Sequence, residues 1–472
     1  MKILVVNICM RPYSDVTMFN VGLGYIMTTM DNAGYKFDFL DIDAHRFSDD
    51  EIDTFLEAKQ YDVIAFGCIV TGYKHVKRLA AQLRRHNPAA TIIAGNTVAS
   101  SIPAVLLNHT ETDVAVMAEG DETIIELLQN LEIGTPLDMV AGIVFKRDGN
   151  LHHTSDRPVL SNLDDLPRMN FDLFDTEIYI GNENERRVAR GNASPLPVRL
   201  LPVNTARGCI AKCTFCYHAF LNKRYRKRST ESILDEIGDM IEKYKLTHVS
   251  LSDELTFFSK KQALGFADAI IERGLKFKWG GQCRAGLFDS MDDVYIAERM
   301  KQAGCQGAFY SLESADPEIL KKMNKKITVE QFSLQTSVFH KGNLPVNTSL
   351  VFGYPEETPA TIARTFDVCI ENKIYPSIGY LLPQPGSPMY DYAMERGLIP
   401  DEEDYIMKIG DRQDLYLNLT SMTNEVFEAE IDKGARRCNA ALGRGLDPDK
   451  LIKTGGYKNR KQADMGAVAG TN

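Results

Sequence analysis

The sequence predicts an α/β protein built from two units of alternating strands and helices, followed by a helical C-terminal segment. Short apolar runs typical of buried strands recur along the chain, and stretches with apolar residues at helical spacing separate them. The chain has 472 residues, more than one ordinary core holds, which favours two or three domains. We expect domains at residues 1–140 and 199–399, a linker at 141–198 and a helical extension at 400–472.

The first unit is predicted to be a doubly wound parallel sheet. Helix-like stretches lie at Val21–Asn32, in YKHVKRLAAQLRRH and in DETIIELLQNL, between or after apolar runs. One of these runs, YDVIAFG, is apolar almost throughout, as expected of a strand buried on both faces. Ligands on such sheets bind at the carboxyl ends of the strands. In chain order, the five strand-like runs are KILVVN, KFDFLDI, YDVIAFG, TIIAG and DVAVMAEG.

The second unit is predicted to be a partial parallel barrel. From about Ile143 to Pro197 the alternation stops, and polar, turn-rich segments predict a linker with a short hairpin. A new block of six strand–helix units begins near Arg199; a full eight-unit barrel takes about 250 residues, so this one is incomplete. The tail from about Ile399 is predicted to be mostly helical. The six strand-like runs are RLLPVNT, THVSLS, FKWGGQC, GAFYSL, VNTSLVFG and YPSIGYLL.

Charge and cysteine usage exclude several classes of protein. The net charge is −10, which argues against a broad electrostatic grip on nucleic acid. Nine cysteines, an odd number, do not form a disulfide framework and favour a reducing cytoplasm. The run VIAFGCIV falls far short of the roughly 20 residues that span a bilayer, so we expect no membrane span. The basic run Lys223–Arg228 is expected to be a solvated surface or, alternatively, an anion contact.

Three cysteines crowd into one loop, TARGCIAKCTFCYHAF, at Cys209, Cys213 and Cys216. A structural zinc site wants four ligands, so His218 or Cys283 would have to complete it. An iron–sulfur cubane held by three thiolates would instead keep one iron open for a small molecule. A chance gathering of core cysteines is the third alternative.

The spacing Cys209-x-x-x-Cys213-x-x-Cys216, with Phe215 before the last cysteine, resembles the signature loop of the radical S-adenosylmethionine (SAM) superfamily. As in that family, the loop follows the first strand of the barrel. Five further stretches resemble the family's later segments in order: SDELTF, WGGQCRAG, YSLESADPEILKKMNKKIT, VFGYPEET and LLPQPGSPMYDYAMERGLI. The resemblance covers roughly Arg199 to Ile399 and implies a [4Fe-4S] cluster on the three cysteines, with SAM on the open iron.

The same resemblance implies roles for residues around the cluster. Phe215, Glu254, Arg284 and Glu313 are implied to lie near SAM, and Tyr217 is a candidate catalytic residue. Each has a structural alternative: a surface or capping role for the two carboxylates, an ion pair for the arginine, and packing for the tyrosine.

Residues 1–130 resemble the flavodoxin-like cobalamin-binding domain of a large branch of that superfamily. Many such domains carry Asp-x-His-x-x-Gly after the first strand, but the corresponding loop here, NICMRPYSDVTMF, has no histidine. His45 follows the second strand, with Ser48 where the glycine should fall, so we expect an ordinary strand-end residue and cobalamin without a histidine ligand. The cobalamin site is expected to be lined by Cys68, Thr71, Gly72, Tyr73, Gly95, Asn96, Thr97, Glu119 and Gly120.

Together the two resemblances imply a cobalamin-dependent radical SAM enzyme of the class B type. Methylation of an unactivated carbon is the commonest reaction with this cofactor pair. Cyclisation or ring rearrangement without methyl transfer is one alternative, and a non-catalytic zinc or corrinoid-binding protein is another. An electron donor such as flavodoxin or ferredoxin is implied, while a peptide, a lipid, a tetrapyrrole or a small metabolite would all fit as substrate.

Overall fold

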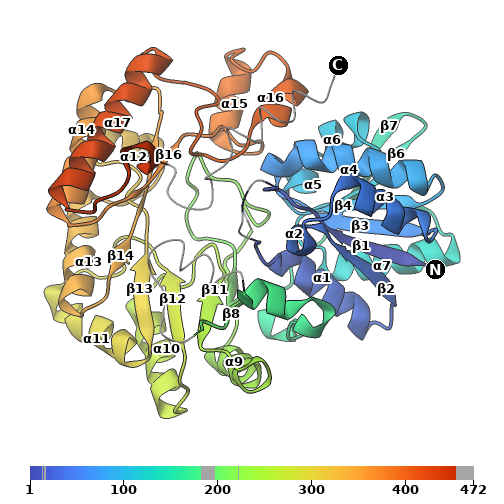
Figure 1. The fold of residues 1–472 in the computed structure, drawn as a ribbon, viewed down its shortest axis with the longest axis horizontal. Helices are drawn as coiled ribbons and strands as arrows, with labels where there is room; N and C mark the ends of the chain where they lie inside the picture. Colours follow the sequence, from blue (N-terminus) through green and yellow to red (C-terminus); the bar gives the residue numbers. More distant parts are fainter. Residues whose placement is uncertain (13, 15–16, 182–196, 222, 453–472) are drawn as a thin grey trace.

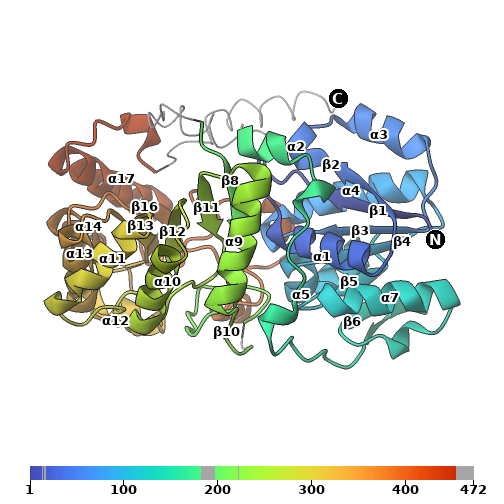
Figure 2. The same cartoon turned by 90° about the horizontal axis from the view of Figure 1, so that it is seen from below.

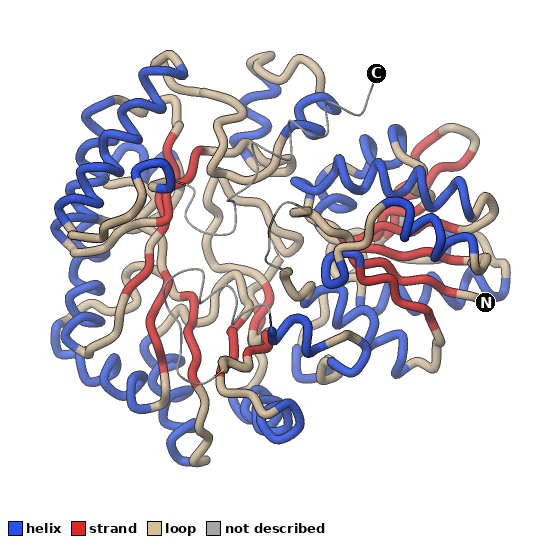
Figure 3. Tube along the Cα trace, in the orientation of Figure 1, coloured by secondary structure: helices blue, strands red, loops and turns tan. Residues whose placement is uncertain are grey.

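The computed structural model describes residues 1–452 apart from residue 13, residues 15–16, residues 182–196 and residue 222. Two α/β units lie side by side, and the last helices of the chain pack against both of them (Figure 1). Helices lie on both sides of the sheet in the first unit and on the outer side of the strands in the second (Figure 3). The predicted fold class is therefore confirmed.

The first unit is a seven-stranded sheet with strand order β2-β1-β3-β4-β5-β6-β7. Its five parallel strands are β1 (Ile3–Asn7), β2 (Phe37–Asp41), β3 (Val63–Gly67), β4 (Thr91–Gly95) and β5 (Val114–Val116). Its helices are α1 (Val21–Asn32), α2 (Ile42–His45), α3 (Asp49–Glu57), α4 (Tyr73–His86), α5 (Thr97–Ser101), α6 (Pro103–His109) and α7 (Asp121–Ile133).

Alternate residues of these strands serve two different cores, as the two-residue period of a strand dictates. In β1, Leu4 and Val6 belong to the core that includes side chains of α3 and α4. Ile3 and Val5 belong to the core that includes side chains of α1 and α7. The sheet is thus buried on both faces, which explains why its strands read as continuous apolar runs.

A hairpin of β6 (Ile143–Arg147) and β7 (Asn150–His153) extends this sheet. β6 pairs antiparallel with β5, and Ile143, Val144 and Phe145 are buried. The hairpin that the sequence predicts inside the linker is therefore the edge of the first sheet.

The second unit is an open barrel of parallel strands. β8 (Leu200–Val203), β11 (His248–Leu251), β12 (Lys278–Gln282), β13 (Cys305–Phe309) and β14 (Val346–Asn347) form one sheet, and β15 (Ser349–Phe352) pairs with β16 (Ser377–Tyr380). A bridge between Glu313 and Leu350 joins the two groups. The single strand predicted at residues 346–353 is divided into the two short strands β14 and β15. The outer helices are α9 (Thr230–Tyr244), α10 (Lys260–Glu272), α11 (Val294–Gln302), α12 (Pro317–Lys322), α13 (Val329–Lys341) and α14 (Pro359–Glu371).

Two smaller features join the units. The strands β9 (Ala206–Arg207) and β10 (Arg226–Lys227) pair antiparallel and enclose the loop that carries the three cysteines. The helix α9 lies on the side of the barrel that faces the first unit (Figures 1 and 2).

After α15 (Pro388–Glu395), the C-terminal segment forms α16 (Glu402–Lys408) and α17 (Asn424–Ala441), which an irregular stretch at residues 409–423 separates. α17 packs on α14, whereas α16 contacts α4 of the first unit (Figure 1). Among the described helices, none combines the length and apolar character needed to cross a membrane.

Candidate functional site

A cavity of about 400 Å³ lies between the first sheet and the barrel. On the side of the sheet it is lined by the ends of β3 and β4 and by the turn after β5. Five of the nine residues expected there line it, namely Gly95, Asn96, Thr97, Glu119 and Gly120. On the side of the barrel it is lined by Asn204, Arg207, Tyr217, His218, Ser252 and Glu254 among others. We call this space the interdomain cavity.

The sheet side of the interdomain cavity is shaped by strained backbone and by apolar walls. Asn96 and Ala118 adopt left-handed conformations with φ of 68° and 54°, which non-glycine residues reach only at a cost in free energy. Ile26 and Val116 form part of an apolar recess between the sheet and its helices. A Cβ atom on Gly120 would lie only 3.0 Å from the Cδ1 atom of Ile26. The recess therefore suits a bulky, largely neutral ligand that approaches the backbone closely.

The four residues of the turn after β3 that were expected at the cobalamin site, Cys68, Thr71, Gly72 and Tyr73, do not line the interdomain cavity. Cys68 is buried, and burial raises the pKa of its thiol to about 12. A Cβ on Gly72 would lie 2.4 Å from the Sγ atom of Cys68, so this glycine is needed for packing. Tyr73 is buried as well and donates a hydrogen bond from its hydroxyl to Glu403 at 2.9 Å. Thr71 lines a different cavity, whereas Ile69 of the same turn lines the interdomain cavity.

His45, the other histidine considered from the sequence, stacks on Phe47 with ring centroids 5.2 Å apart. It ends α2 and does not line the interdomain cavity in the part of the chain that is described. His218 does line it, and its Nδ1 atom is buried without a hydrogen-bond partner.

The cysteine loop is fastened to the segment that follows α12. Thr214 donates from its backbone N to the carbonyl of Met323 at 3.0 Å and from its hydroxyl to the carbonyl of Lys322 at 2.9 Å. Asn324 donates from its side chain to the carbonyl of Lys212 at 2.8 Å. The backbone around the cysteines is therefore held in one conformation by a segment about 110 residues away along the chain.

The three cysteines of this loop are free thiols that influence one another. Burial, together with the neighbouring Cys213 and Cys209, raises the pKa of Cys216 to about 12. Burial also raises the pKa of Cys213.

The proposed fourth ligand Cys283 belongs to the barrel core. It is buried, and its Sγ atom accepts a hydrogen bond from Gln335 at 3.7 Å. Burial raises the pKa of this thiol, and the neighbouring Cys305 adds to the rise. Among the described residues, no three His, Cys, Asp or Glu side chains come close enough together to hold a single metal ion.

A buried ion pair lies next to the cysteines. Lys325 donates from Nζ to Oε1 of Glu313 at 2.9 Å, and the two side chains are 15% and 5% exposed. Burial opposes the charge of Lys325, but Glu313 and Cys213 outweigh it, and the pKa of the lysine is raised. Lys325 also lies over the ring of Phe215, 5.9 Å from its centroid.

Two of the expected SAM-binding residues shape this ion pair. Glu313 has a φ of 65°, a strained conformation that places its carboxylate beside Lys325. Arg284 donates to the backbone carbonyls of Lys325 and Lys326, both at 2.8 Å, so it holds the segment that carries the lysine. Sequence reasoning missed Lys325, because nothing distinguishes it from the other lysines of KKMNKK.

The segment after β11 carries two carboxylates, Asp253 and Glu254, which make different contacts. Asp253 accepts hydrogen bonds from the backbone N atoms of Thr205 at 2.7 Å and Ala206 at 2.9 Å, and burial raises its pKa to about 6. This carboxyl group fastens β11 to the start of β9. Glu254 lines the interdomain cavity, accepts from the backbone N of Gly208 at 3.1 Å, and has its pKa raised by burial.

A second cavity, of about 350 Å³, also borders the cysteine loop, and Gln384 lines both cavities. Phe215 and Cys216 line it together with Val351, Tyr380 and Leu381 from β15, β16 and the residue that follows β16. Tyr217 lines the interdomain cavity instead, and burial raises its pKa to about 12. Two adjacent residues of the loop, Cys216 and Tyr217, thus face two different cavities.

The basic run Lys223–Arg228 is not the solvated surface that the sequence favours. Arg226 and Arg228 are only 6% and 5% exposed, and they pair with Glu119 and Glu236. Their partners come from other parts of the chain, so the run by itself carries no sign of its burial.

Comparison with protein families gives two matches along the chain. Residues 13–128 match the B12 binding domain, and residues 203–369 match the radical SAM superfamily. The first match contains the strand ends that line the interdomain cavity, and the second contains the cysteine loop.

Solved structures share the fold of both units. The radical SAM methyltransferase TsrM from Kitasatospora setae, with cobalamin and a [4Fe-4S] cluster bound, superposes with a TM-score of 0.65 at 17% identity. The superposition covers 84% of this chain and 78% of the TsrM chain. The cobalamin-dependent radical enzyme OxsB superposes with a TM-score of 0.64 at 16% identity, covering 89% of this chain and 58% of its own.

Curated relatives have several activities. An uncharacterised methyltransferase of Pyrococcus horikoshii is 27% identical over 61% of this chain and 59% of its own length. The anaerobic magnesium-protoporphyrin IX monomethyl ester cyclase of Rubrivivax gelatinosus is 23% identical over 78% of this chain and 64% of its own. This chain thus spans less than two thirds of either relative. Cytidylyl-2-hydroxyethylphosphonate methyltransferase of Streptomyces wedmorensis is 22% identical over 93% of this chain and 89% of its own length.

Proposed function

We propose that this chain, which carries a B12-binding domain followed by a radical SAM domain, is a cobalamin-dependent methyltransferase that acts on an unactivated carbon. The observation that carries the proposal is the interdomain cavity, because residues of both domains line one space next to the cysteine loop. A methyl donor and a radical source must reach the same carbon, and a shared cavity supports that requirement.

The cysteine loop fits an iron–sulfur cluster. Cys209, Cys213 and Cys216 would hold three of its irons, and the anchored backbone of the loop would keep the thiolates in place. When bound, the cluster and SAM would supply a carbon-centred radical, and cobalamin would supply the methyl group.

The residues around the loop fit a charged ligand with an aromatic base. Lys325 and Glu313 offer one charge of each sign beside the thiols, so they would orient the carboxylate and the amine of SAM. The second cavity, with Phe215, Val351 and Tyr380 on its walls, would take the nucleoside part. Glu254 and Tyr217 face the interdomain cavity, where they would contact the substrate or SAM.

The B12-binding domain fits its ligand through shape. The glycines at the strand ends and the apolar recess beneath them would hold cobalamin by close backbone approach and by burial. We expect no histidine of this domain to ligate the cobalt, because His45 lies away from the cavity in a stacked pair.

The test is anaerobic incubation of the reconstituted protein with SAM, cobalamin and a low-potential reductant. Formation of both 5′-deoxyadenosine and S-adenosylhomocysteine supports methyl transfer. Deoxyadenosine without S-adenosylhomocysteine supports the second candidate, a cyclase, which the relative from Rubrivivax gelatinosus favours. A product heavier by one methylene separates the two reactions, and a protein with zinc and no iron contradicts both.

Two further expectations belong to this proposal. The reaction needs one-electron donation, for which a small redox protein such as flavodoxin or ferredoxin is the expected partner. All nine cysteines are free thiols, which supports a reducing compartment such as the cytoplasm. The substrate itself stays open among peptides, lipids, tetrapyrroles and small metabolites.

A further inference from the structure

The turn after β5, residues 117–121, is held in a strained shape; we call it the cofactor loop. Ala118 has a φ of 54°, and its backbone N donates to the hydroxyl of Ser100 at 2.9 Å. A left-handed alanine persists only where surrounding contacts determine it. The first unit supplies the contact with Ser100 and another, in which the backbone N of Met117 donates to the carbonyl of Gly142 at 2.9 Å, and the barrel supplies further contacts.

Two arginines of the barrel hold the carboxylates of the cofactor loop. Arg226 donates to Glu119 at 2.8 and 2.9 Å, and Arg207 donates to Glu119 at 3.0 Å. Arg207 also donates to both oxygens of Asp121, at 2.7 and 3.1 Å. The four side chains are between 4% and 12% exposed, so these are buried pairs with little screening by solvent.

The carboxylate of Glu119 is fully engaged in these contacts. Its Oε2 atom also accepts a hydrogen bond from the backbone N of Leu160 at 2.8 Å. Although Glu119 lines the interdomain cavity, its carboxylate oxygens accept hydrogen bonds from the barrel arginines. This argues against a direct role of Glu119 as a cofactor ligand.

The same two arginines close the cysteine loop. Arg207 and Arg226 face each other as direct partners in the β9–β10 ladder, which brackets residues 208–225. Arg207 stands two residues before Cys209. A single pair of residues therefore joins the base of the cysteine loop to the cofactor loop of the other domain.

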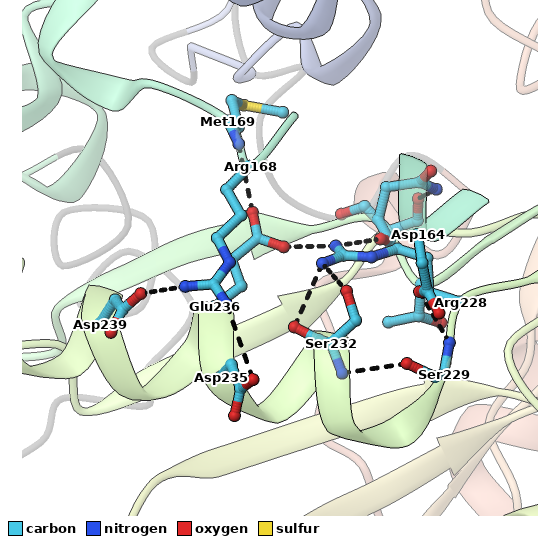
Figure 4. Close-up of polar contacts among 12 residues, drawn as sticks. Asp164, Arg168, Met169, Arg228, Ser229, Ser232, Asp235, Glu236 and Asp239 are labelled. Carbon is cyan, nitrogen blue, oxygen red and sulfur yellow. Dashed lines mark hydrogen bonds and ion pairs between the residues drawn. The ribbon is translucent and has the colours of Figure 1, made fainter. Parts of the chain in front are cut away.

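Arg228, which belongs to the same basic run as Arg226, makes a different set of contacts and serves as a comparison (Figure 4). Arg228 is as deeply buried as Arg226, but it pairs with Glu236 of α9 and donates to the hydroxyl of Ser232 at 2.9 Å. Glu236 in turn accepts from the backbone N of Met169 at 3.3 Å. Arg228 therefore holds Glu236, which contacts the linker, and it makes no described contact with the cofactor loop.

We propose that Arg207 and Arg226 are positioning residues that hold the cofactor loop in its cobalamin-binding shape. The affinity of the first domain for cobalamin then depends on its contact with the barrel, although neither domain's family match predicts such a link. This inference rests on the proposed function, because it assumes that cobalamin occupies the interdomain cavity.

The test uses the full chain, reconstituted anaerobically with its cluster, and hydroxocobalamin as the probe in equilibrium dialysis. Arg226→Met should weaken binding about tenfold, the scale on which supporting residues affect a bound group. Arg228→Met, the matched control, should change the dissociation constant less than about twofold, because it acts on a separate contact. Arg226→Lys keeps the charge but not the forked geometry, so it should fall between wild type and Arg226→Met.

Unfolding in urea, measured on the same proteins, separates positioning from general destabilisation. Both methionine variants should lose stability, but only Arg226→Met should lose affinity. Equal dissociation constants for wild type and Arg226→Met overturn the inference, and so does an equal loss in Arg228→Met. If Arg226→Met does not fold, Arg226→Lys decides the matter by the same criterion. Failure of the wild-type protein to bind hydroxocobalamin overturns the proposed function, and with it this inference.

Discussion

The first sheet and the mouth of the barrel prepare for their ligands in opposite ways. The sheet presents strand-end glycines, such as Gly95 and Gly120, above an apolar recess. The barrel mouth presents charged side chains in a buried setting, with Lys325 paired to Glu313 beside the thiols. The first region offers its ligand close backbone approach, and its buried carboxylates Glu119 and Asp121 pair with the barrel arginines; the second offers balanced charge.

This difference predicts whether a substitution should affect ligand binding or the stability of the fold. A neutral wall costs little free energy to bury, so altering it should affect the ligand more than the fold. A buried charge is costly unless it is paired, so removing one partner should affect the whole unit. The expected effects below run from the largest to the smallest and test this contrast.

The largest effect is expected from Cys213→Ala in the barrel mouth. Loss of one of three thiolates should abolish the cluster, so iron should fall from about four atoms per chain to a small residue. Iron analysis after anaerobic reconstitution, together with the yield of 5′-deoxyadenosine, measures this. Cys283→Ala is the control and should retain iron, since Cys283 lies in the barrel core. An unchanged iron content in Cys213→Ala would remove the basis of the proposal.

The next effect concerns the buried ion pair. Lys325→Met should leave Glu313 buried without its partner and lower the free energy of unfolding by about 3–5 kcal/mol. Denaturation in urea under anaerobic conditions gives the value. The double variant Lys325→Met/Glu313→Gln removes both charges and should recover part of that loss. A single variant more stable than the double variant would show that the pair is not held by charge balance.

A smaller effect, confined to the ligand, is expected in the first sheet. In Gly120→Val the new Cβ would lie only 3.0 Å from the Cδ1 atom of Ile26, and the side chain adds further atoms. The variant should therefore weaken hydroxocobalamin binding about tenfold. Iron content should stay unchanged, in contrast to Cys213→Ala. Gly265→Val is the control, because a Cβ at Gly265 has no described neighbour within 4 Å. If Gly120→Val lost its iron, the separation between the two regions would not hold.

The smallest effect is expected where the C-terminal segment contacts the first domain. Glu403 accepts hydrogen bonds from Tyr73 at 2.9 Å and Lys77 at 2.5 Å, and it pairs with His109 at 2.9 Å. The side chains of Lys77 and His109 are 40% and 48% exposed. Glu403→Gln should therefore lower the free energy of unfolding by no more than about 1 kcal/mol.

The pH dependence of that effect has a definite sign. Partial burial opposes the charge of Glu403, but the hydrogen bonds from Lys77 and Tyr73 outweigh it and lower its pKa. A carboxyl group with a lowered pKa contributes stability above its ordinary pKa of 4.5 and loses it as the pH falls through the folded value. The difference between wild type and Glu403→Gln, measured by urea denaturation, should therefore shrink below pH 4.5, whereas a constant difference would contradict the assignment.

Much of the fold could be predicted because its signals are local. The buried strands of the first sheet read as apolar runs, and helices such as Thr230–Tyr244 show apolar residues at helical spacing. The packing of the turn after β3 could not be predicted, since the direction in which a turn bends depends on what packs against it. Here Gly72 lies against Cys68, and Tyr73 reaches Glu403 of a distant helix.

The sequence by itself determined the motif of the cysteine loop and its resemblance to the radical SAM family, because the spacing of Cys209, Cys213 and Cys216 is a property of one short segment. Only the tertiary structure decided which charges meet. Arg207 and Glu119 lie 88 residues apart along the chain, and Lys325 lies 12 residues from Glu313, beyond any helical neighbour. Whether two such groups form an ion pair depends on distance and burial in space, which no local pattern of residues encodes.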